Sequence, residues 1–178
     1  GLDAGTTYYF RVISADTSAN TTTVPAPPAA PSTFATTPSP YTCPCTIWPN
    51  SQVPALVSAN DPSAVELGLK WQSVISGYVT GVRFYKGATN TGVHTGTLWS
   101  NSGAVLATVT FAGESASGWQ EAYFSSPVHV NANTTYVISY HTTTGFYSAD
   151  LGYFTTVGAT SGPLTALSNG TAGGNGVY

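Results

Sequence analysis

The sequence contains no methionine and few charged residues, and this scarcity of charge excludes several classes of partner. Lys and Arg number four and Asp and Glu number seven, so charged residues make up 6% of the 178 residues, against about 25% in ordinary soluble proteins. The basic residues are scattered and form no stripe that could neutralise several phosphates, so we expect no binding to nucleic acid. The apolar runs are short and broken by Thr, Gly or Pro, so we also expect no membrane insertion.

Cysteine is almost as scarce, with Cys43 and Cys45 as the two copies and Pro44 between them. A disulfide between the two would close a small, constrained ring. Two reduced thiols and one half of a metal site are the other interpretations, although no second group of Cys or His supplies the remaining metal ligands. Because Thr, Ser, Gly, Asn and Tyr replace the missing charge, the composition suits oxidising surroundings, and we expect a protein that is secreted or displayed at the cell surface.

The first residues of the chain have the pattern of a β-strand. Residues 6–14 alternate between two faces, which is the period-2 signature of a strand. The run GLDAGTTY at 1–8, followed by RV at 11–12, is similar to the end of a fibronectin type III domain. That resemblance implies that Tyr8 is the tyrosine-corner residue, whose hydroxyl bonds to nearby backbone. We therefore expect residues 1–23 to be a partial fibronectin type III end.

A segment of different composition follows. Residues 24–42 consist mainly of Pro, Thr, Ala and Ser and show no hydrophobic period. This composition favours extended polyproline geometry, with a reach of about 3 Å per residue. We therefore expect a semi-rigid spacer that sets a distance between the partial domain and the rest of the chain.

The remaining residues, 43–178, have the pattern of an all-β domain. The segments in which apolar and polar residues alternate are 65–71, 78–85, 95–99, 104–111, 119–124 and 134–141. Polar or Gly-containing turns separate them, and no window shows a helical stripe with a cap at its start. The pattern predicts an antiparallel two-sheet β-sandwich that resembles a jelly roll. The aromatic residues expected in its core are Trp71, Phe84, Trp99, Phe111 and Trp119.

Several motifs in this part of the chain resemble a bacterial family of domains of unknown function. The motifs are GYVTGVRFYKG at 77–87, GTLWS at 96–100, SGWQ at 117–120 and TTYVISYH at 134–141. The resemblance implies a secreted multidomain protein in which such domains stand beside fibronectin type III modules, and it implies no established activity. Members of the family continue through a further strand, so the domain is expected to lack its last strand and the chain to be a fragment.

No combination of residues in the sequence points to catalysis. The carboxylates after the spacer are Asp61, Glu66, Glu114, Glu121 and Asp150. Their spacing suggests no pair of the kind that hydrolyses glycosides, and no Gly-x-Ser-x-Gly motif marks a serine hydrolase. The histidines are His94, His129 and His141. Each is interpreted as a surface or hydrogen-bonded core histidine, because their spacing is not that of metal ligands, and we expect a protein that is not an enzyme.

Aromatic residues point instead to binding. They make up 12% of the chain, including 11 Tyr and four Trp, and such rings can stack on sugars while neighbouring amides and hydroxyls bind the sugar hydroxyls. The candidate ligand-binding residues are Trp48, Tyr147, Asp150 and Tyr153, which lie in turn-rich sequence, and Tyr178 is a further aromatic near a boundary. Asp150 is also a candidate calcium ligand. A neutral glycan or another cell-surface polymer is the expected partner.

Two function classes remain open, with a third behind them. The first is a non-catalytic extracellular binding or adhesion module. The second is a structural subunit of an extracellular filament, in which copies associate through open sheet edges by strand addition or domain exchange. An accessory domain of a secreted hydrolase would have the same sequence features as the first.

Overall fold

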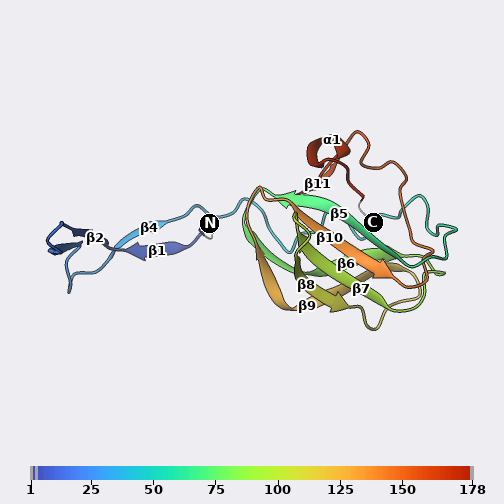
Figure 1. Cartoon of the computed structure of the whole chain (residues 1–178), viewed down its shortest axis with the longest axis horizontal. Coiled ribbons are helices and arrows are strands. Elements are labelled where there is room, and N and C mark those ends of the chain that lie inside the picture. Colours follow the sequence, from blue (N-terminus) through green and yellow to red (C-terminus); the bar gives the residue numbers. More distant parts are fainter. Residues whose placement is uncertain (1, 3, 177–178) are drawn as a thin grey trace. The chain divides into compact units, whose positions relative to one another are not determined.

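The chain forms two compact units. The computed structural model describes residue 2 and residues 4–176 (Figure 1), and the units are Gly1–Thr42 and Cys43–Tyr178. Tyr178, the boundary aromatic of the sequence analysis, lies outside the described residues. In the part of the chain that the structure describes, no helix has the length and apolarity needed to cross a membrane.

The first unit consists of two antiparallel strand pairs. Its strands are β1 (Thr7–Phe10), β2 (Val12–Ala15), β3 (Thr21–Val24) and β4 (Ser32–Ala35). Strand β1 pairs with β4, and β2 pairs with β3. The expected spacer, residues 24–42, is therefore not an uninterrupted extended linker, because it contains β4. The rings of Phe34 in β4 and Tyr8 in β1 stack with centroids 5.5 Å apart, a cross-strand aromatic contact of the kind that stabilises strand pairs.

As far as residue 176, the second unit has β-strands and one helical turn as its regular elements, as the alternation predicts. Its elements are β5 (Val65–Ser73), β6 (Gly77–Lys86), β7 (His94–Ser100), β8 (Val105–Thr110), β9 (Gly118–Val130), β10 (Tyr136–Thr142), β11 (Ala159–Ser161), β12 (Leu164–Ala166) and α1 (Asn169–Ala172). Each predicted strand segment overlaps one of β5 to β10, which confirms the all-β fold class.

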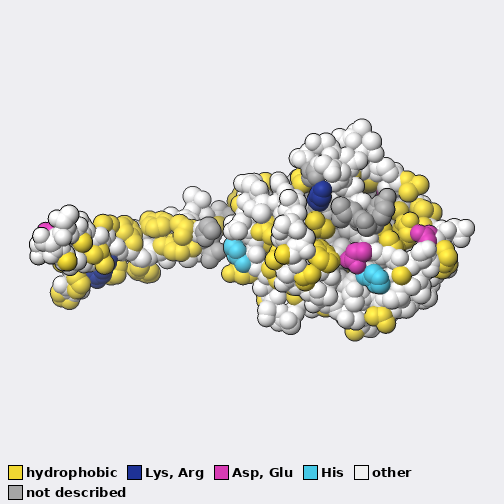
Figure 2. Space-filling view, viewed as in Figure 1, with side chains coloured by type: hydrophobic (Ala, Val, Ile, Leu, Met, Phe, Trp, Pro, Cys, Tyr) yellow, Lys and Arg dark blue, Asp and Glu magenta, His cyan; other side chains and the backbone are white. Residues whose placement is uncertain are grey.

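Two antiparallel sheets form a sandwich. The larger sheet has the strand order β11-β12-β5-β10-β7-β8, and the smaller sheet pairs β6 with β9. The core between the sheets is apolar and partly aromatic: Phe84 of β6 stacks on Tyr140 of β10 with ring centroids 4.2 Å apart. Charged side chains are few on the face drawn in Figure 2, as the composition requires.

Two of the five aromatic residues expected in the core lie elsewhere. Trp71, Phe84 and Phe111 are buried, but Trp99 and Trp119 are half-buried. In the first half of β9 the buried side chains are Gln120, Ala122 and Phe124, so Trp119 belongs to the outward-facing set together with the exposed Glu121 and Tyr123. The expectation for Trp119 is wrong because alternation defines two faces without saying which of them is the inner one.

Candidate functional site

A cleft lies along one side of the sandwich, where loop segments meet the inner faces of both sheets. Its volume is about 660 Å³, within the usual range for small-molecule sites of about 300–1,000 Å³. Its apolar floor includes Leu67 and Leu69 of β5, Val82 and Phe84 of β6, and Tyr140 of β10. These residues lie on the inner faces because strand alternation directs them toward the core.

Two loop segments cross this side of the sandwich and are joined to each other. Leu56 and Ala149 exchange two backbone hydrogen bonds of 3.0 and 2.8 Å, and the amide of Ala59 donates to the carbonyl of Tyr147 at 2.8 Å. Further along, the amide of Phe146 donates to the carbonyl of Asp61 at 2.7 Å. These bonds hold the two segments together as one wall of the cleft.

The four residues that the sequence analysis selected for ligand binding all line this cleft. They are Trp48, Tyr147, Asp150 and Tyr153. The Trp48 Nε1–H donates to the Tyr153 hydroxyl at 3.1 Å, and the two rings meet edge to face with centroids 6.0 Å apart. Tyr147 packs against the core. Asp150 Oδ1 accepts the amide of Ala55 at 2.7 Å, so this carboxylate helps to join the two segments of the wall.

Asp150 is the candidate calcium ligand of the sequence analysis. Within residues 2 and 4–176, no three His, Cys, Asp or Glu side chains gather in a way that could hold a metal ion. Cys43 and Cys45 are joined by a disulfide. Both cysteines line an adjoining apolar pocket of about 380 Å³, which shares Trp48 and Arg83 with the cleft.

Three further residues line the rim of the cleft: Arg83, Tyr85 and Trp119. The sequence analysis did not select them for ligand binding. The Arg83 guanidinium carbon lies 4.3 Å from the centroid of the Trp119 ring, and the Tyr85 ring meets Trp119 edge to face at 5.7 Å. The Trp119 Nε1–H donates to the carbonyl of Gln52 at 2.9 Å. Glu121 lies two residues after Trp119 and therefore on the same face of β9. A charged residue on that face is the sequence signal that could have assigned Trp119 to the surface.

Arg83 ties the smaller sheet to the segment that precedes β5. Its guanidinium donates to the carbonyl of Trp48 at 3.3 Å and to Asn50 Oδ1 at 2.6 Å. Burial lowers the pKa of Arg83, and the carboxylate of Glu121, 3.5 Å from Arg83 Nε, opposes that shift. Because the ordinary arginine pKa exceeds 12, Arg83 stays charged, and its charge is shared among these acceptors and the Trp119 ring.

Comparison with known proteins identifies the domain. The family described as domain of unknown function (DUF4082) matches residues 51–178. The chain belongs to the DUF4082 family. The match spans β5 to β12 and most of the cleft. No curated protein and no solved structure matches the chain, so the arguments about function start from the geometry of the DUF4082 domain itself.

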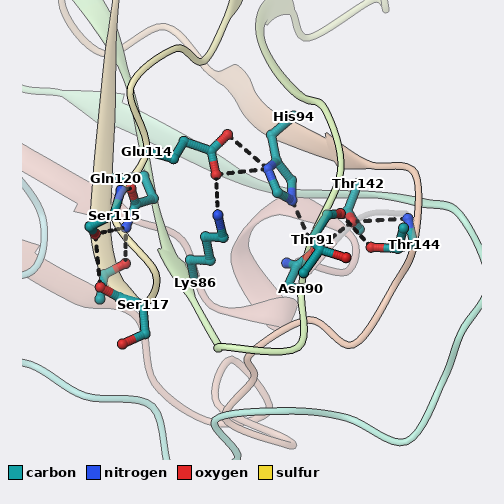
Figure 3. A network of polar contacts seen from close by, with 11 residues as sticks. Lys86, Asn90, Thr91, His94, Glu114, Ser115, Ser117, Gln120, Thr142 and Thr144 are labelled. Carbon is teal, nitrogen blue, oxygen red and sulfur yellow. Dashed lines mark hydrogen bonds and ion pairs between the residues drawn. The ribbon is translucent and has the colours of Figure 1, made fainter.

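The DUF4082 domain also contains a buried polar network (Figure 3). The Glu114 carboxylate accepts Lys86 Nζ at 2.7 Å and the Nδ1–H of His94 at 2.8 Å. On the other side of its ring, His94 Nε2 lies 2.9 Å from Asn90 Oδ1, which also accepts the hydroxyl of Thr142 at 2.6 Å. His94, Asn90 and Thr142 have no exposed surface. His94 is thus a hydrogen-bonded core histidine, and its ring is closed to a substrate.

Proposed function

We propose that this DUF4082 domain is a non-catalytic extracellular module that binds neutral carbohydrate in the aromatic cleft. The observation that carries the proposal is the convergence of Trp48, Trp119 and Tyr153 at the rim of one cleft of about 660 Å³. An indole or phenol ring offers a flat apolar face to the C–H groups of a sugar, and neighbouring polar groups can bind its hydroxyls.

The charges at the cleft favour a neutral ligand over a charged one. Arg83 is surrounded by acceptors of the protein and lies 3.5 Å from Glu121. Asp61 Oδ1 accepts the amide of Ser63 at 2.9 Å, and Asp150 Oδ1 accepts the amide of Ala55 at 2.7 Å. Each charged group therefore already has partners within the domain, and an acidic or basic sugar would have to compete with them.

An extracellular location fits the same features. A surface with few charges and a local disulfide at Cys43 and Cys45 suits an oxidising compartment. The likeness of residues 1–23 to a fibronectin type III end belongs to the same proposal, since such modules commonly accompany binding domains on secreted proteins.

Retention on polysaccharides tests the proposal. The full chain is run by affinity electrophoresis through cellulose derivative, xylan, mannan and starch, with polygalacturonate as the acidic comparison. We expect retention by at least one neutral polymer, and a loss of about tenfold in affinity for Trp119→Ala or Tyr153→Ala, the effect of losing about 1.4 kcal/mol of ring stacking. Trp99→Ala is the matched control, because Trp99 is also half-buried but is not among the residues that line the cleft.

Two outcomes would overturn the proposal. Migration unaffected by the four neutral polymers would overturn neutral carbohydrate as the ligand, whether or not polygalacturonate retards the protein. Release of reducing sugar from a retained polymer would overturn the non-catalytic assignment, and Asp61 and Asp150, the two carboxylates of the cleft, would then be substituted one at a time.

A structural role is the second candidate, and the first unit supplies the observation that favours it. Within the residues that the structure describes, its sheets have two strands each, so each of the four strands pairs along one edge. Val12 and Ile13 are 57% and 68% exposed. Open edges with apolar side chains favour pairing between copies. Sedimentation velocity tests this: the mass should rise with concentration and fall for Ile13→Lys, whereas a monomer at every concentration would exclude the role.

A further inference from the structure

The outer face of the smaller sheet continues the rim of the cleft. Antiparallel pairing places Tyr85 directly opposite Trp119 and Arg83 opposite Glu121. Tyr85, Arg83 and Trp119 line the cleft, and Glu121 is the next outward-facing residue of β9 after Trp119. The cleft and the outer face of this sheet therefore share Arg83, Tyr85 and Trp119.

Beyond the cleft, the same face carries two further aromatic positions. Tyr123 stands opposite Gly81, and Tyr78 stands opposite His129 with their rings edge to face at 5.3 Å. Tyr123 and Tyr78 are 68% and 63% exposed. A single exposed tyrosine is ordinary, but here exposed rings follow one another along the two paired strands that begin at the cleft.

The Tyr123 ring is oriented and kept accessible by its neighbours. Its hydroxyl donates to Glu121 Oε2 at 3.1 Å, and the other oxygen of Glu121 lies 3.5 Å from Arg83 Nε. Gly81, across the strand pair, has no side chain that could cover the ring. A Cβ at Gly81 would lie 2.2 Å from the carbonyl oxygen of Ala122, so the backbone itself requires glycine there. A ring held in place before binding loses less entropy when a ligand stacks on it.

The spacing of these rings suits a ligand of several sugar units. Tyr123 follows Trp119 by four residues on the same side of β9, which corresponds to about 13 Å along a strand. One sugar unit cannot contact both rings at that separation. Tyr78 and His129 lie further along the same two strands, past a shift in register between Val79 and Gly81, and lengthen the surface beyond Tyr123.

We propose that the outer face of β6 and β9 is an extended subsite, and that the ligand of the cleft is an internal stretch of a linear neutral polysaccharide. The cleft holds one part of the polysaccharide between Trp48, Trp119 and Tyr153. The exposed rings of Tyr123 and Tyr78 stack on sugar units further along the same polysaccharide. This inference rests on the proposed function. It specifies that the ligand is a run of several linked sugar units and not a single terminal sugar.

The number of sugar units in the ligand is the variable that tests the inference. Calorimetric titration of the full protein chain uses cello-, xylo-, manno- and malto-oligosaccharides of two to six units. We expect the six-unit sugar of the recognised series to bind about tenfold more tightly than the two-unit sugar, a gain of about 1.4 kcal/mol. Tyr123→Ala should abolish most of that gain and leave two-unit binding unchanged, whereas Trp119→Ala should weaken both.

Tyr9→Ala is the matched control, because Tyr9 is 71% exposed but belongs to the first unit, and it should change neither affinity. Equal affinities for two and six units, or a six-unit affinity that Tyr123→Ala leaves intact, would overturn the extended subsite while the cleft itself still binds sugar. Failure of the wild-type protein to bind any of the four series would overturn the proposed function and this inference with it.

Discussion

Substitution of Glu114 by glutamine should destabilise the protein far more than the usual surface substitution. The change keeps the shape of the side chain but removes the negative charge that Lys86 and His94 share. His94 is fully buried, and the side chains of Lys86 and Glu114 are 11% and 12% exposed. The substitution therefore leaves the charge of Lys86 nearly buried with no carboxylate beside it.

The size of the effect follows from this burial. Breaking a buried ion pair by removing one partner costs about 3–5 kcal/mol. Glu114 and Lys86 keep some contact with water, so we expect the lower end of that range, about 3 kcal/mol, which lowers the melting temperature of a chain of this size by about 6–12 °C. Glu121→Gln is the control: Glu121 is 45% exposed and pairs with Arg83 at 3.5 Å, and a long contact to a carboxylate that water reaches is worth about 1 kcal/mol or less.

The effect of Glu114→Gln should also depend on pH. Burial alone would raise the pKa of the Glu114 carboxyl, but the hydrogen bonds from Lys86 and His94 outweigh it and lower the pKa below the ordinary value of 4.5. A lowered pKa in the folded state means that the unfolded state takes up the proton first. The stabilisation is therefore complete above pH 4.5 and is lost as the pH falls through the lowered value.

Urea unfolding of wild type, Glu114→Gln and Glu121→Gln at pH 7 and at pH 3–4 measures both parts of this prediction. Contributions to stability that are common to the three proteins cancel in the differences. The free energy of unfolding of Glu114→Gln should lie about 3 kcal/mol below that of wild type at pH 7, and this difference should be smaller at pH 3–4. A difference no larger than that between Glu121→Gln and wild type, or one that does not change with pH, would refute the reasoning.

Two further predictions concern packing and the end of the described chain. Gly96→Ala would place a Cβ within 2.8–3.0 Å of three side-chain carbons of Val82. Urea unfolding should therefore show that the free energy of unfolding falls by about 1–3 kcal/mol. Gly77→Ala is the control, because Gly77 has open space around it, and it should change the free energy of unfolding by less than about 0.5 kcal/mol. Asn175→Ala removes hydrogen bonds of 2.6 and 2.9 Å to the amide and carbonyl of Lys70. Hydrogen exchange at the Lys70 amide should become roughly fivefold faster, which corresponds to about 1 kcal/mol. Unchanged exchange would show that another contact protects this amide.

The strands of the sandwich were predictable because burial of one face imposes a local pattern. In β5, for example, Val65, Leu67, Leu69 and Trp71 alternate with more polar residues, and this pattern needs no knowledge of neighbours. The prediction failed where both faces of a strand carry large side chains. In β9, Phe124 points inward and Trp119 outward, and local alternation cannot distinguish an aromatic core residue from an aromatic surface residue.

The candidate site was partly predictable for a different reason. Trp48, Tyr147, Asp150 and Tyr153 were selected because they lie in turn-rich sequence, and loops commonly carry binding residues. Their common location could not be predicted, because the two segments of the wall meet through contacts across long sequence separations. The hydrogen bond from Ala55 to Asp150, for instance, joins residues 95 positions apart.

The all-β character, the low-charge exterior and the aromatic loops follow from the sequence alone, because each depends on composition or on neighbours a few residues away. Tertiary structure decided which of those residues meet. Glu114 reaches Lys86 and His94 across 28 and 20 positions, and Trp119 meets Tyr85 only in the register of β6 with β9. Strand order and register are set by burial summed over the whole domain, so both the network and the cleft exist only once the sheets have packed.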